Sequence, residues 1–430
     1  MWMKRKLHLI LRFSAGGTVR NRLYGCLFML IILILPALGG CEKSRSGQEK
    51  LIILQNKVEI HDSFQKLLKQ YEKETGVETV LRTFSGEAYT SNLNSTITNE
   101  EGPVIFSTGG YVNTWQYGEY LEELSDEEWA DRIIDAEYLM PVTKESKIYG
   151  YPFNVEAFGI LYNADLLREA GINADEIRTL SQFKACLKTL SRICDNPISL
   201  GFGETWIPGL HVTNIAFGHE KEPLQLMEKL SDGKRSLLQT AQFRDMVDVL
   251  DVLKDSTTEE IVITDYNRQI TDFANGNCAM ILNGSWAYSA VKNLNPDLNI
   301  DIMGLPYNDE DSELNQQFPK GITTFWCINA HASSGQKEAA KRFLDWLTFS
   351  PQGKDYILEQ EQFVSPFYKT ASEENPISGK IAAKEGLPFL YMNYPPGIGM
   401  KDWGASIQRY MAGAISEEKL LTELNASWTR

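Results

Sequence analysis

Four tryptophans lie in polar stretches marked by glycine or proline, where side chains can meet a ligand. They are Trp115, Trp206, Trp286 and Trp403, each in or beside a break between apolar runs. A sugar presents flat C–H faces and a rim of hydroxyl groups, so indole rings suit the faces and Asp, Glu and Asn suit the rim. A hydrogen bond to a charged group contributes about 1.5–3 kcal/mol. The pattern favours carbohydrate binding, although large aromatic residues also anchor loops by packing.

The chain shows no recognisable catalytic motif. Residues 41–430 contain four histidines, and none forms an HExxH motif or a close-spaced pair with a carboxylate of the kind typical of zinc sites. There is no GxSxG elbow and no GxxxxGKS or GxxxxGKT loop. Carboxylate pairs are common in so acidic a chain and do not identify a glycosidase. These absences favour binding over catalysis, and no metal or organic cofactor is expected.

The cysteine spacing argues against disulfides and zinc knuckles. Cys186 and Cys194 are eight residues apart in an expected helix, which separates them by about 12 Å at about 1.5 Å per residue. A disulfide needs Cα atoms within about 7 Å, so these two should not pair. Cys278 and Cys327 fall in separate strand-like runs, and no CxxC motif occurs.

The first forty residues have the composition of an export signal. Six basic residues and no acidic residue precede position 41, and residues 27–38 are almost all apolar. A bilayer span needs roughly 20 apolar residues, so this shorter run is typical of a signal peptide over residues 1–40. Leu38-Gly39-Gly40-Cys41 resembles a bacterial lipobox, in which the cysteine becomes the first residue and carries fatty-acyl chains such as palmitate. An ordinary signal peptide with a chance cysteine is the alternative.

The rest of the chain is long enough for two packed domains and is strongly acidic. The leader holds six of the 42 basic residues and none of the 57 acidic ones, so 36 basic residues remain against 57 acidic, a net charge of −21. Such a surface repels nucleic acid and anionic lipid headgroups. Residues 41–50 are polar and are expected to form a flexible tether to the lipid anchor. A lipid-anchored protein outside the cytoplasm favours a Gram-positive cell surface.

Strand-like and helix-like runs alternate after the tether. An apolar run of strand length precedes a helical stripe, which is formed by Phe64, Leu67, Leu68 and Tyr71. Gly76 is the expected C-cap of that helix. Further strands are expected at residues 77–81, 104–106, 158–162, 278–282, 299–303 and 323–328. This alternation predicts an α/β fold with largely parallel sheets.

Four segments carry a resemblance to a known family. The longest is residues 149–167, with the sequence Tyr-Gly-Tyr-Pro-Phe-Asn-Val-Glu-Ala-Phe-Gly-Ile-Leu-Tyr-Asn-Ala-Asp-Leu-Leu. The others are residues 73–77, 273–286 and 337–353, and all four follow the family's order. Together they resemble the family 1 extracellular solute-binding proteins, the maltodextrin-binding kind that serve ABC importers. The resemblance covers essentially the whole chain after the leader.

That resemblance implies a type II periplasmic-binding-protein fold, in which two lobes close on a ligand in the cleft between them. Each lobe is expected to be a largely parallel sheet flanked by helices. The N-terminal lobe would comprise residues 51–152 and 321–370, and the C-terminal lobe residues 153–320 and 371–430, with the first crossing at Tyr151-Pro152. The implied protein is a monomer without enzymatic activity that delivers a small carbohydrate to the transmembrane subunits of an ABC permease.

The resemblance also implies positions for ligand-binding residues. Glu156 matches a carboxylate that contacts sugar in maltodextrin binders. Trp206 and Glu204 match a stacking aromatic residue and a neighbouring acid. Trp286 matches a second aromatic residue, and Asn56 matches a polar residue of the cleft.

Trp403 matches an aromatic residue on a late helix of the family. One earlier segment departs from the family pattern. Where maltodextrin binders carry Trp, Asp and Arg, this chain has Ser107, Thr108 and Tyr111, with Trp115 a turn later. We therefore expect a less charged wall in the N-terminal lobe, with these four residues as candidate ligand contacts. The departure argues against maltose itself and leaves other carbohydrates open.

Two other functions stay open at this point. A binding protein for a non-sugar solute, or a ligand sensor for a membrane kinase, would keep the same fold with a different cargo or partner. A surface enzyme that cleaves glycans would use a carboxylate such as Glu156 or Glu204 as its acid or base.

Overall fold

The computed structural model describes residues 50–430 except 311–312, 370–373, 384–385, 396 and 429–430. The expected signal peptide, the lipidation site Cys41 and all of the tether except Lys50 lie outside the described residues. The described part of the chain contains two five-stranded sheets and a two-stranded one. We call the parts built on the two larger sheets the first lobe and the second lobe.

The first lobe is built on a sheet with the strand order β2-β1-β3-β12-β6. Its strands are β1 (Leu51–Gln55), β2 (Thr79–Thr83), β3 (Ile105–Thr108), β6 (Tyr151–Pro152) and β12 (Phe325–Ile328). Strand β1 pairs in parallel with β2 and β3, while β12 runs antiparallel to both β3 and β6. All five residues of β1 are buried, as its uninterrupted apolar sequence predicts.

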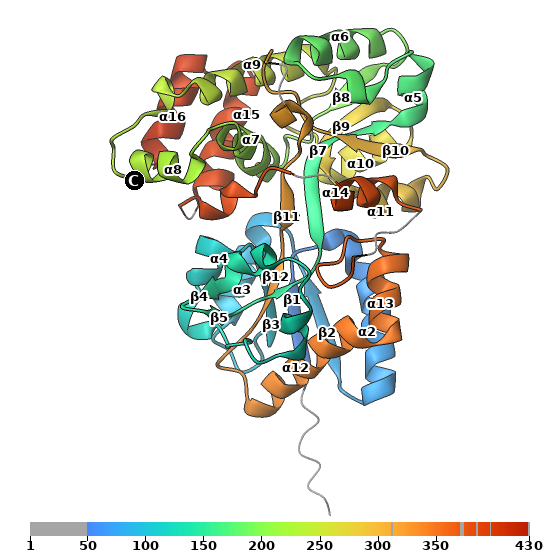
Figure 1. Cartoon of the computed structure of the whole chain (residues 1–430), viewed down its shortest axis with the longest axis vertical. Helices are drawn as coiled ribbons and strands as arrows, with labels where there is room; N and C mark the ends of the chain where they lie inside the picture. The colour runs from blue at the N-terminus through green and yellow to red at the C-terminus, as the bar shows by residue number, and fades with distance from the viewer. Residues whose placement is uncertain (1–49, 311–312, 370–373, 384–385, 396, 429–430) are drawn as a thin grey trace, which may run out of the picture. The chain divides into compact units, whose positions relative to one another are not determined.

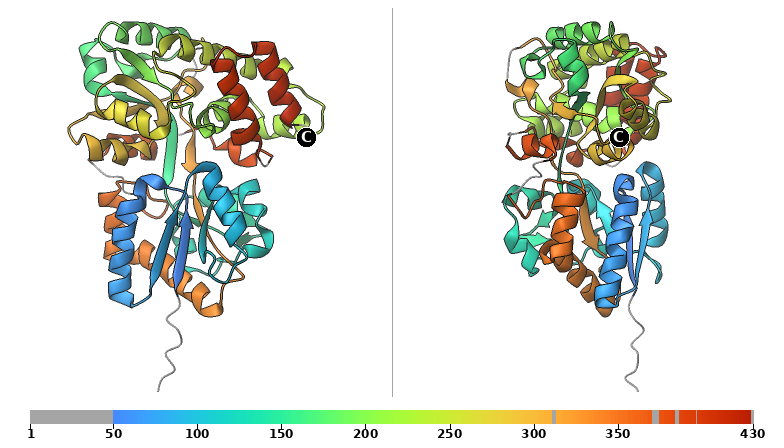
Figure 2. Two further views of the ribbon diagram at one scale, coloured as in Figure 1. Left: turned by 180° about the vertical axis from the view of Figure 1, so that it is seen from behind. Right: turned by 90° about the vertical axis from the view of Figure 1, so that its right-hand side faces the viewer.

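Helices surround this sheet (Figure 1). They are α2 (His61–Thr75), α3 (Gly86–Thr96), α4 (Tyr111–Trp115), α12 (Ser334–Phe349) and α13 (Pro351–Asp355). The expected stripe of α2 is buried, and its Tyr71 ring lies 5.0 Å from that of Phe343 in α12. Gly76 caps α2 with a φ of 76°, as predicted. Both views of Figure 2 show α2 and α12 beside the first sheet.

The second lobe is built on a sheet with the order β10-β7-β9-β8, in which β11 also pairs with β7. Its strands are β7 (Val155–Asn163), β8 (Asn196–Ser199), β9 (Cys278–Gly284), β10 (Ile300–Met303) and β11 (Lys320–Ile322). All nine residues of β7 are buried. The pairing of β8 with β9 is parallel, whereas β7 runs antiparallel to β9, β10 and β11.

Both sheets are largely parallel in strand direction, as expected, but each contains one strand that runs against the other four. Strand β7 arrives from the first lobe, and β12 returns to the first lobe from the second. Each of them enters its sheet against the direction of the strands that the local strand–helix–strand units supply. The alternation of strands and helices along the chain does not reveal these returning strands.

The second lobe also contains helices. They are α5 (Ala164–Glu169), α6 (Leu180–Leu190), α7 (Thr213–Gly218), α8 (Pro223–Ser231), α9 (Ala241–Ser256), α10 (Tyr266–Ala274), α11 (Ala287–Leu294), α14 (Pro376–Ala383), α15 (Ala405–Met411) and α16 (Glu417–Trp428). The Asn163 side chain caps α5 by accepting hydrogen bonds from two backbone N–H groups. Helix α6 ends at Leu190, so Cys194 lies beyond the helix that was expected to hold it. Both Cys186 and Cys194 are free thiols.

Shorter elements complete the described part of the chain. The two-stranded sheet pairs β4 (Thr143–Lys144) with β5 (Lys147–Ile148). Short 3-10 turns are η1 (Val58–Ile60), η2 (Gly118–Tyr120), η3 (Glu128–Arg132), η4 (Ala136–Val142), η5 (Ala174–Glu176), η7 (Leu237–Gln239), η8 (Glu313–Gln316) and η10 (Leu390–Asn393). The π-helical turns are η6 (Ile207–Val212), η9 (Tyr356–Gln360) and η11 (Ile398–Gly404).

Two extended segments connect the lobes directly. Residues 153–154 join β6 of the first sheet to β7 of the second, and residues 323–324 join β11 back to β12. The N–H of Val155 donates to the carbonyl of Val364 at 2.8 Å, which brings a third segment to the same place. The lobe boundaries expected after residues 152, 320 and 370 stay predictions.

Candidate ligand-binding site

A cavity of about 780 Å³ is lined by residues of both lobes. Seven of the ten predicted ligand-binding residues line it, namely Asn56, Ser107, Thr108, Glu156, Glu204, Trp206 and Trp286. Their role in binding stays a prediction. The volume lies in the range of about 300–1,000 Å³ that is typical of small-molecule sites.

Strand direction explains why these residues meet. Asn56 follows β1 directly, and Ser107 and Thr108 end β3, which is parallel to β1. Trp206 lies in the segment after β8, and Trp286 in the segment after β9, which is parallel to β8. Carboxyl ends of parallel strands share one edge of a sheet, and this edge is where ligands bind in α/β proteins. The parallel pairs of both lobes thus present their carboxyl ends to the cavity.

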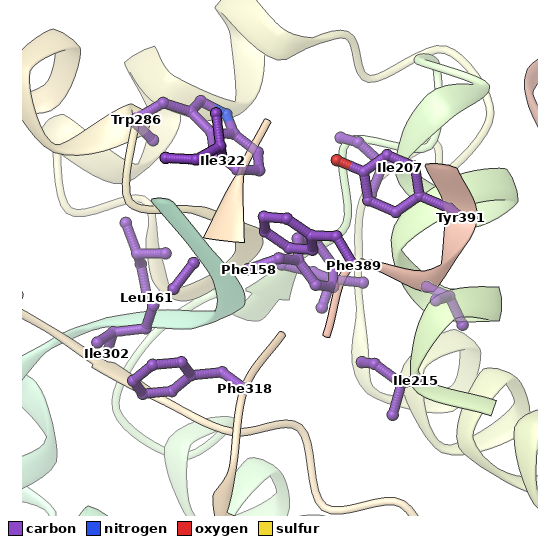
Figure 3. Packing of buried hydrophobic residues seen from close by; sticks show 14 of the residues in the cluster. Phe158, Leu161, Ile207, Ile215, Trp286, Ile302, Phe318, Ile322, Phe389 and Tyr391 are labelled. Atoms are coloured by element: carbon purple, nitrogen blue, oxygen red, sulfur yellow. The ribbon is translucent and has the colours of Figure 1, made fainter. Parts of the chain in front are cut away.

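The second-lobe wall is aromatic. The rings of Trp206 and Trp286 lie 6.0 Å apart, and the His211 ring lies 5.3 Å from each of them. Phe158 of β7 stacks on the other side of His211 at 4.3 Å, with 24° between the rings. Figure 3 shows Trp286, Phe158 and Tyr391 among the buried apolar side chains of this wall. The Nε1–H of Trp206 donates to Glu204 Oε2 at 3.2 Å.

His211 belongs to this wall although no sequence pattern marked it as a ligand-binding residue. Burial lowers the pKa of its imidazole to about 3, so the ring is neutral at physiological pH. Among the described residues its Nδ1 atom has no hydrogen-bond partner. The signal that could have found it is local, since His211 lies five residues after Trp206 on the π-helical turn η6. A π-turn places residues five apart on one face, and π-turns are frequent at functional sites.

A charged cluster lies where the lobes meet. Lys57 Nζ lies 2.6 Å from Glu156 Oε1 and 3.1 Å from Glu59 Oε1. Thr323 donates a hydrogen bond to the other oxygen of Glu156. The exposed fractions of the Lys57, Glu59 and Glu156 side chains are 6%, 8% and 2%. The cluster therefore joins the end of β1 in the first lobe to β7 in the second.

Burial and charge act against each other in this cluster. Burial lowers the pKa of Lys57, but attraction to Glu156 and Glu59 outweighs it, so the pKa is raised overall. Burial raises the pKa of Glu59, and the Lys57 ammonium only partly offsets this. The family pattern marked only Asn56 in this segment. Lys57 and Glu59 follow it closely but match no family residue, so they were not predicted.

Around Ser107 and Thr108 the first-lobe wall carries hydroxyls and amides, whereas Lys57 and Glu59 of the same lobe bring charge to the cavity. Tyr89 holds the end of β3 by donating to the Ser107 carbonyl at 2.6 Å and accepting from its N–H at 2.7 Å. The Oγ1 atoms of Thr108 and Thr114 lie 2.7 Å apart. In the described part of the chain, Ser107 Oγ and Asn56 Oδ1 are buried without a partner. Unsatisfied buried polar atoms carry a desolvation cost that a ligand hydroxyl would relieve.

Three predicted residues, Trp403, Tyr111 and Trp115, do not line the cavity. Trp403 is fully buried, its ring stacks on Phe217 at 6.2 Å, and its Nε1–H donates to the Leu424 carbonyl at 2.9 Å. Its segment does reach the cavity, but through Gly399 and Met400 instead. The indole was expected in the cleft, and the structure corrects this because α7 and α16 supply its packing partners Phe217 and Trp428 and α16 supplies its acceptor.

Tyr111 and Trp115 occupy the two ends of α4. Tyr111 begins the helix with a φ of 41° and packs against the core. Trp115 meets Tyr149 edge-on at 5.9 Å, and Lys144 Nζ lies 5.8 Å from the centre of its ring. Both aromatic side chains anchor α4 against neighbouring segments, which is the alternative role of loop aromatics. The expectation of ligand contacts from them is not supported by their positions.

The described residues offer neither a metal-binding cluster nor a membrane-spanning helix. In this part of the chain, no group of three or more His, Cys, Asp or Glu side chains is placed to hold a metal ion. None of its helices is both long and apolar enough to cross a bilayer.

Comparison with known proteins assigns a family. Residues 66–388 match the family model described as a bacterial extracellular solute-binding protein. The chain belongs to the bacterial extracellular solute-binding proteins. These proteins bind solutes and are not enzymes, which confirms the expectation of no catalysis. The family's description as extracellular agrees with the expected location outside the cytoplasm.

Individual solute-binding proteins of this family resemble the chain at low identity. MelE, the melibiose/raffinose/stachyose-binding protein of Bacillus subtilis (strain 168), is 24% identical over 288 residues, which cover 64% of this chain and 66% of MelE. A Bacillus licheniformis sugar transporter in complex with stachyose gives a TM-score of 0.73 at 18% identity, covering 89% of this chain and all of that one. RafE in complex with raffinose gives 0.74 at 20% identity, covering 89% and 99%. The structural likeness confirms the two-lobed type II fold.

Proposed function

We propose that this protein is the solute-binding component of an ABC importer and that its cargo is a sugar, most consistently an oligosaccharide. The two lobes would close on the ligand in the cavity described above. The observation that carries the proposal is the pairing of an aromatic wall, built from Trp206, Trp286 and His211, with an opposite wall of hydroxyls and amides.

The two walls match the two surfaces of a pyranose ring. Partly exposed Trp206 offers an indole face for the C–H surface of a sugar, next to the edge of Trp286. Ser107 Oγ and Asn56 Oδ1 offer partners for sugar hydroxyls on the other side of the cavity. The carboxylates of Glu156 and Glu204 accept strong hydrogen bonds from hydroxyl donors.

The relatives support an oligosaccharide in particular. MelE is named for melibiose, raffinose and stachyose, and the two similar structures hold stachyose and raffinose. The cavity volume of about 780 Å³ lies toward the upper end of the usual range, which leaves room for more than one sugar ring. A short oligosaccharide therefore fits both the relatives and the space.

The anchor and the partner belong to the same proposal. Lipidation of Cys41 would hold the protein at the membrane, because each buried CH₂ group of an acyl chain contributes about 0.8 kcal/mol. The polar tether of residues 41–50 would keep a monomeric binding protein close to its permease, where a high effective concentration replaces strong affinity.

Titration calorimetry of the full chain in detergent tests the cargo. The panel should contain melibiose, raffinose, stachyose, maltotriose and a chitin oligosaccharide, together with a peptide, a polyamine and a metal complex. We expect at least one oligosaccharide to bind with a micromolar or lower Kd. Silence of every sugar combined with tight binding of one of the other solutes would overturn the proposal.

A further inference from the structure

Acidic side chains outnumber basic ones in the cavity. Among its lining residues that the structure describes, Lys57 is the one cationic side chain, and Glu59, Glu156 and Glu204 are carboxylates. His211 is buried and neutral, so it adds no positive charge. The cavity therefore carries excess negative charge, in keeping with the acidity of the chain as a whole.

The ammonium group of Lys57 is already paired with carboxylates of the protein. This group lies within 3.1 Å of a carboxylate oxygen of both Glu59 and Glu156, and all three side chains are at least nine-tenths buried. Gln55 fixes the Lys57 backbone on both sides, with its Oε1 accepting from the Lys57 N–H at 2.7 Å and its Nε2 donating to the Lys57 carbonyl at 2.8 Å. Lys57 is thus held in place between two acids instead of reaching toward a ligand.

Free partners in the cavity are neutral. Ser107 and His211 have exposed fractions of 1% and 5%, line the cavity, and keep Ser107 Oγ and His211 Nδ1 without a partner in the described part of the chain. The hydroxyl of Tyr266, another lining residue, is likewise buried and unpaired among the described residues. These atoms suit hydroxyl and amide groups of a ligand, whereas they offer no charge to balance an anion.

We infer that Glu59 is a specificity-determining residue, which occupies Lys57 together with Glu156 and so makes the site accept neutral sugars and reject anionic ones. This inference rests on the proposed function. A uronate or sugar phosphate would enter a desolvated site with surplus carboxylate and no spare cation, so its own charge would stay unbalanced. Rejection by an unpaired charge is a recognised way to gain specificity.

Three matched forms of each sugar separate charge from size. Melibiose, raffinose and stachyose are each compared with derivatives in which C6 of the terminal galactose is oxidised to a uronate or converted to the uncharged uronamide. With the full wild-type chain in detergent, we expect the uronamide to bind within about threefold of the parent sugar. We expect the uronate to bind at least tenfold more weakly than the uronamide.

The variant Glu59→Gln keeps the shape of the side chain and releases Lys57 from one carboxylate. We expect it to reduce the gap, defined as the ratio of the uronate Kd to the uronamide Kd, at least fivefold. Glu87→Gln is the matched control, because this substitution removes the same charge. Glu87 is exposed beside Gly86 at the cavity and does not contact Lys57. The control should leave the gap unchanged.

The outcomes separate this inference from the proposed function. If every sugar of the calorimetry panel is silent while another solute binds tightly, the proposed function fails. If a parent sugar binds and the wild-type protein accepts the uronate as well as the uronamide, or Glu59→Gln leaves the gap as wide as Glu87→Gln does, the role of Glu59 is overturned. Should Glu59→Gln not fold, Glu156→Gln releases the other contact of Lys57, and an unchanged gap there overturns the inference equally.

Discussion

At the residue scale, two tryptophans in similar sequence surroundings have opposite roles. Trp206 and Trp403 each lie near glycine and a short polar run. Trp206 lines the cavity and is held by Glu204, whereas Trp403 is enclosed by Phe217, Tyr394 and α16. Residue type and neighbours along the chain do not separate the two roles, because the contacts that decide them come from distant segments.

Alanine substitution should separate the two roles experimentally. Trp206→Ala should weaken sugar binding at least tenfold, or about 1.4 kcal/mol, and leave stability nearly unchanged, because the ring is partly exposed. Trp403→Ala should lower the free energy of unfolding by about 3–5 kcal/mol, since it empties a fully buried site. Calorimetry and chemical denaturation measure the two quantities. Undiminished affinity of the Trp206 variant would contradict the aromatic wall.

His211 should make stability depend on pH. Its pKa is about 3 in the folded protein against about 6.5 in an unfolded chain, so acid protonates the unfolded chain first. The contribution is fully present above pH 6.5 and is lost as pH falls from about 6.5 toward 3, with a slope of at most about 1.4 kcal/mol per pH unit. Urea titrations of wild type and His211→Gln between pH 7 and pH 4 measure it. The wild type should lose more stability than the variant, and parallel curves would rule the effect out.

At the scale of elements, the cavity depends on the close contact of two π-helical turns. A Cβ at Gly209 in η6 would overlap the Gly399 carbonyl oxygen and approach the Gly404 backbone in η11. Turn η6 also carries His211, and η11 carries Gly399 and Met400, which line the cavity. The absence of one side chain thus sets the spacing between two elements of the binding wall.

Gly209→Ala tests this contact. Because backbone atoms rather than a flexible side chain oppose the new methyl group, we expect a loss of about 1–3 kcal/mol in the free energy of unfolding. Sugar affinity should fall with it, as η6 shifts. Gly379→Ala in α14 is the control, because a Cβ there meets nothing and alanine favours a helix by up to about 1 kcal/mol. Equal effects of the two substitutions in denaturation experiments would exclude the proposed crowding.

At the scale of the whole described molecule, few chain segments connect the two lobes. Strands β6 and β7 are joined by two residues, as are β11 and β12. The Lys57–Glu156 ion pair lies beside these connections and links the end of β1 to β7. A buried pair at this position bears on both the stability of the fold and the placement of one lobe against the other.

A double-mutant cycle measures that link. Lys57→Met and Glu156→Gln, made singly and together, should show a coupling of more than about 1.5 kcal/mol in unfolding free energy, because the pair is buried and closely spaced. The exposed pair Lys147–Glu123 is the control and should couple by less than about 1 kcal/mol. Additive effects at Lys57 and Glu156 would show that the pair does not join the lobes energetically.

Features that depend on neighbours along the chain were predictable from the sequence alone. The stripe and the C-cap of α2, the cap of α5 at Asn163 and the buried strand β7 follow from local periodicity and capping chemistry. Family resemblance added the two-lobed architecture, which the comparisons confirm, and residues such as Glu156 and Trp286 beside the cavity.

Long-range packing set the direction of the returning strands, the burial of Trp403, and the assembly of His211, Lys57 and Glu59 at the cavity. Each of these outcomes depends on a partner far away in sequence, such as α16 for Trp403 or β7 for Lys57. Local spacing states which residues share a face of one helix or strand. It does not state which distant segment will cover that face, because that choice is made by packing and charge pairing in the folded chain.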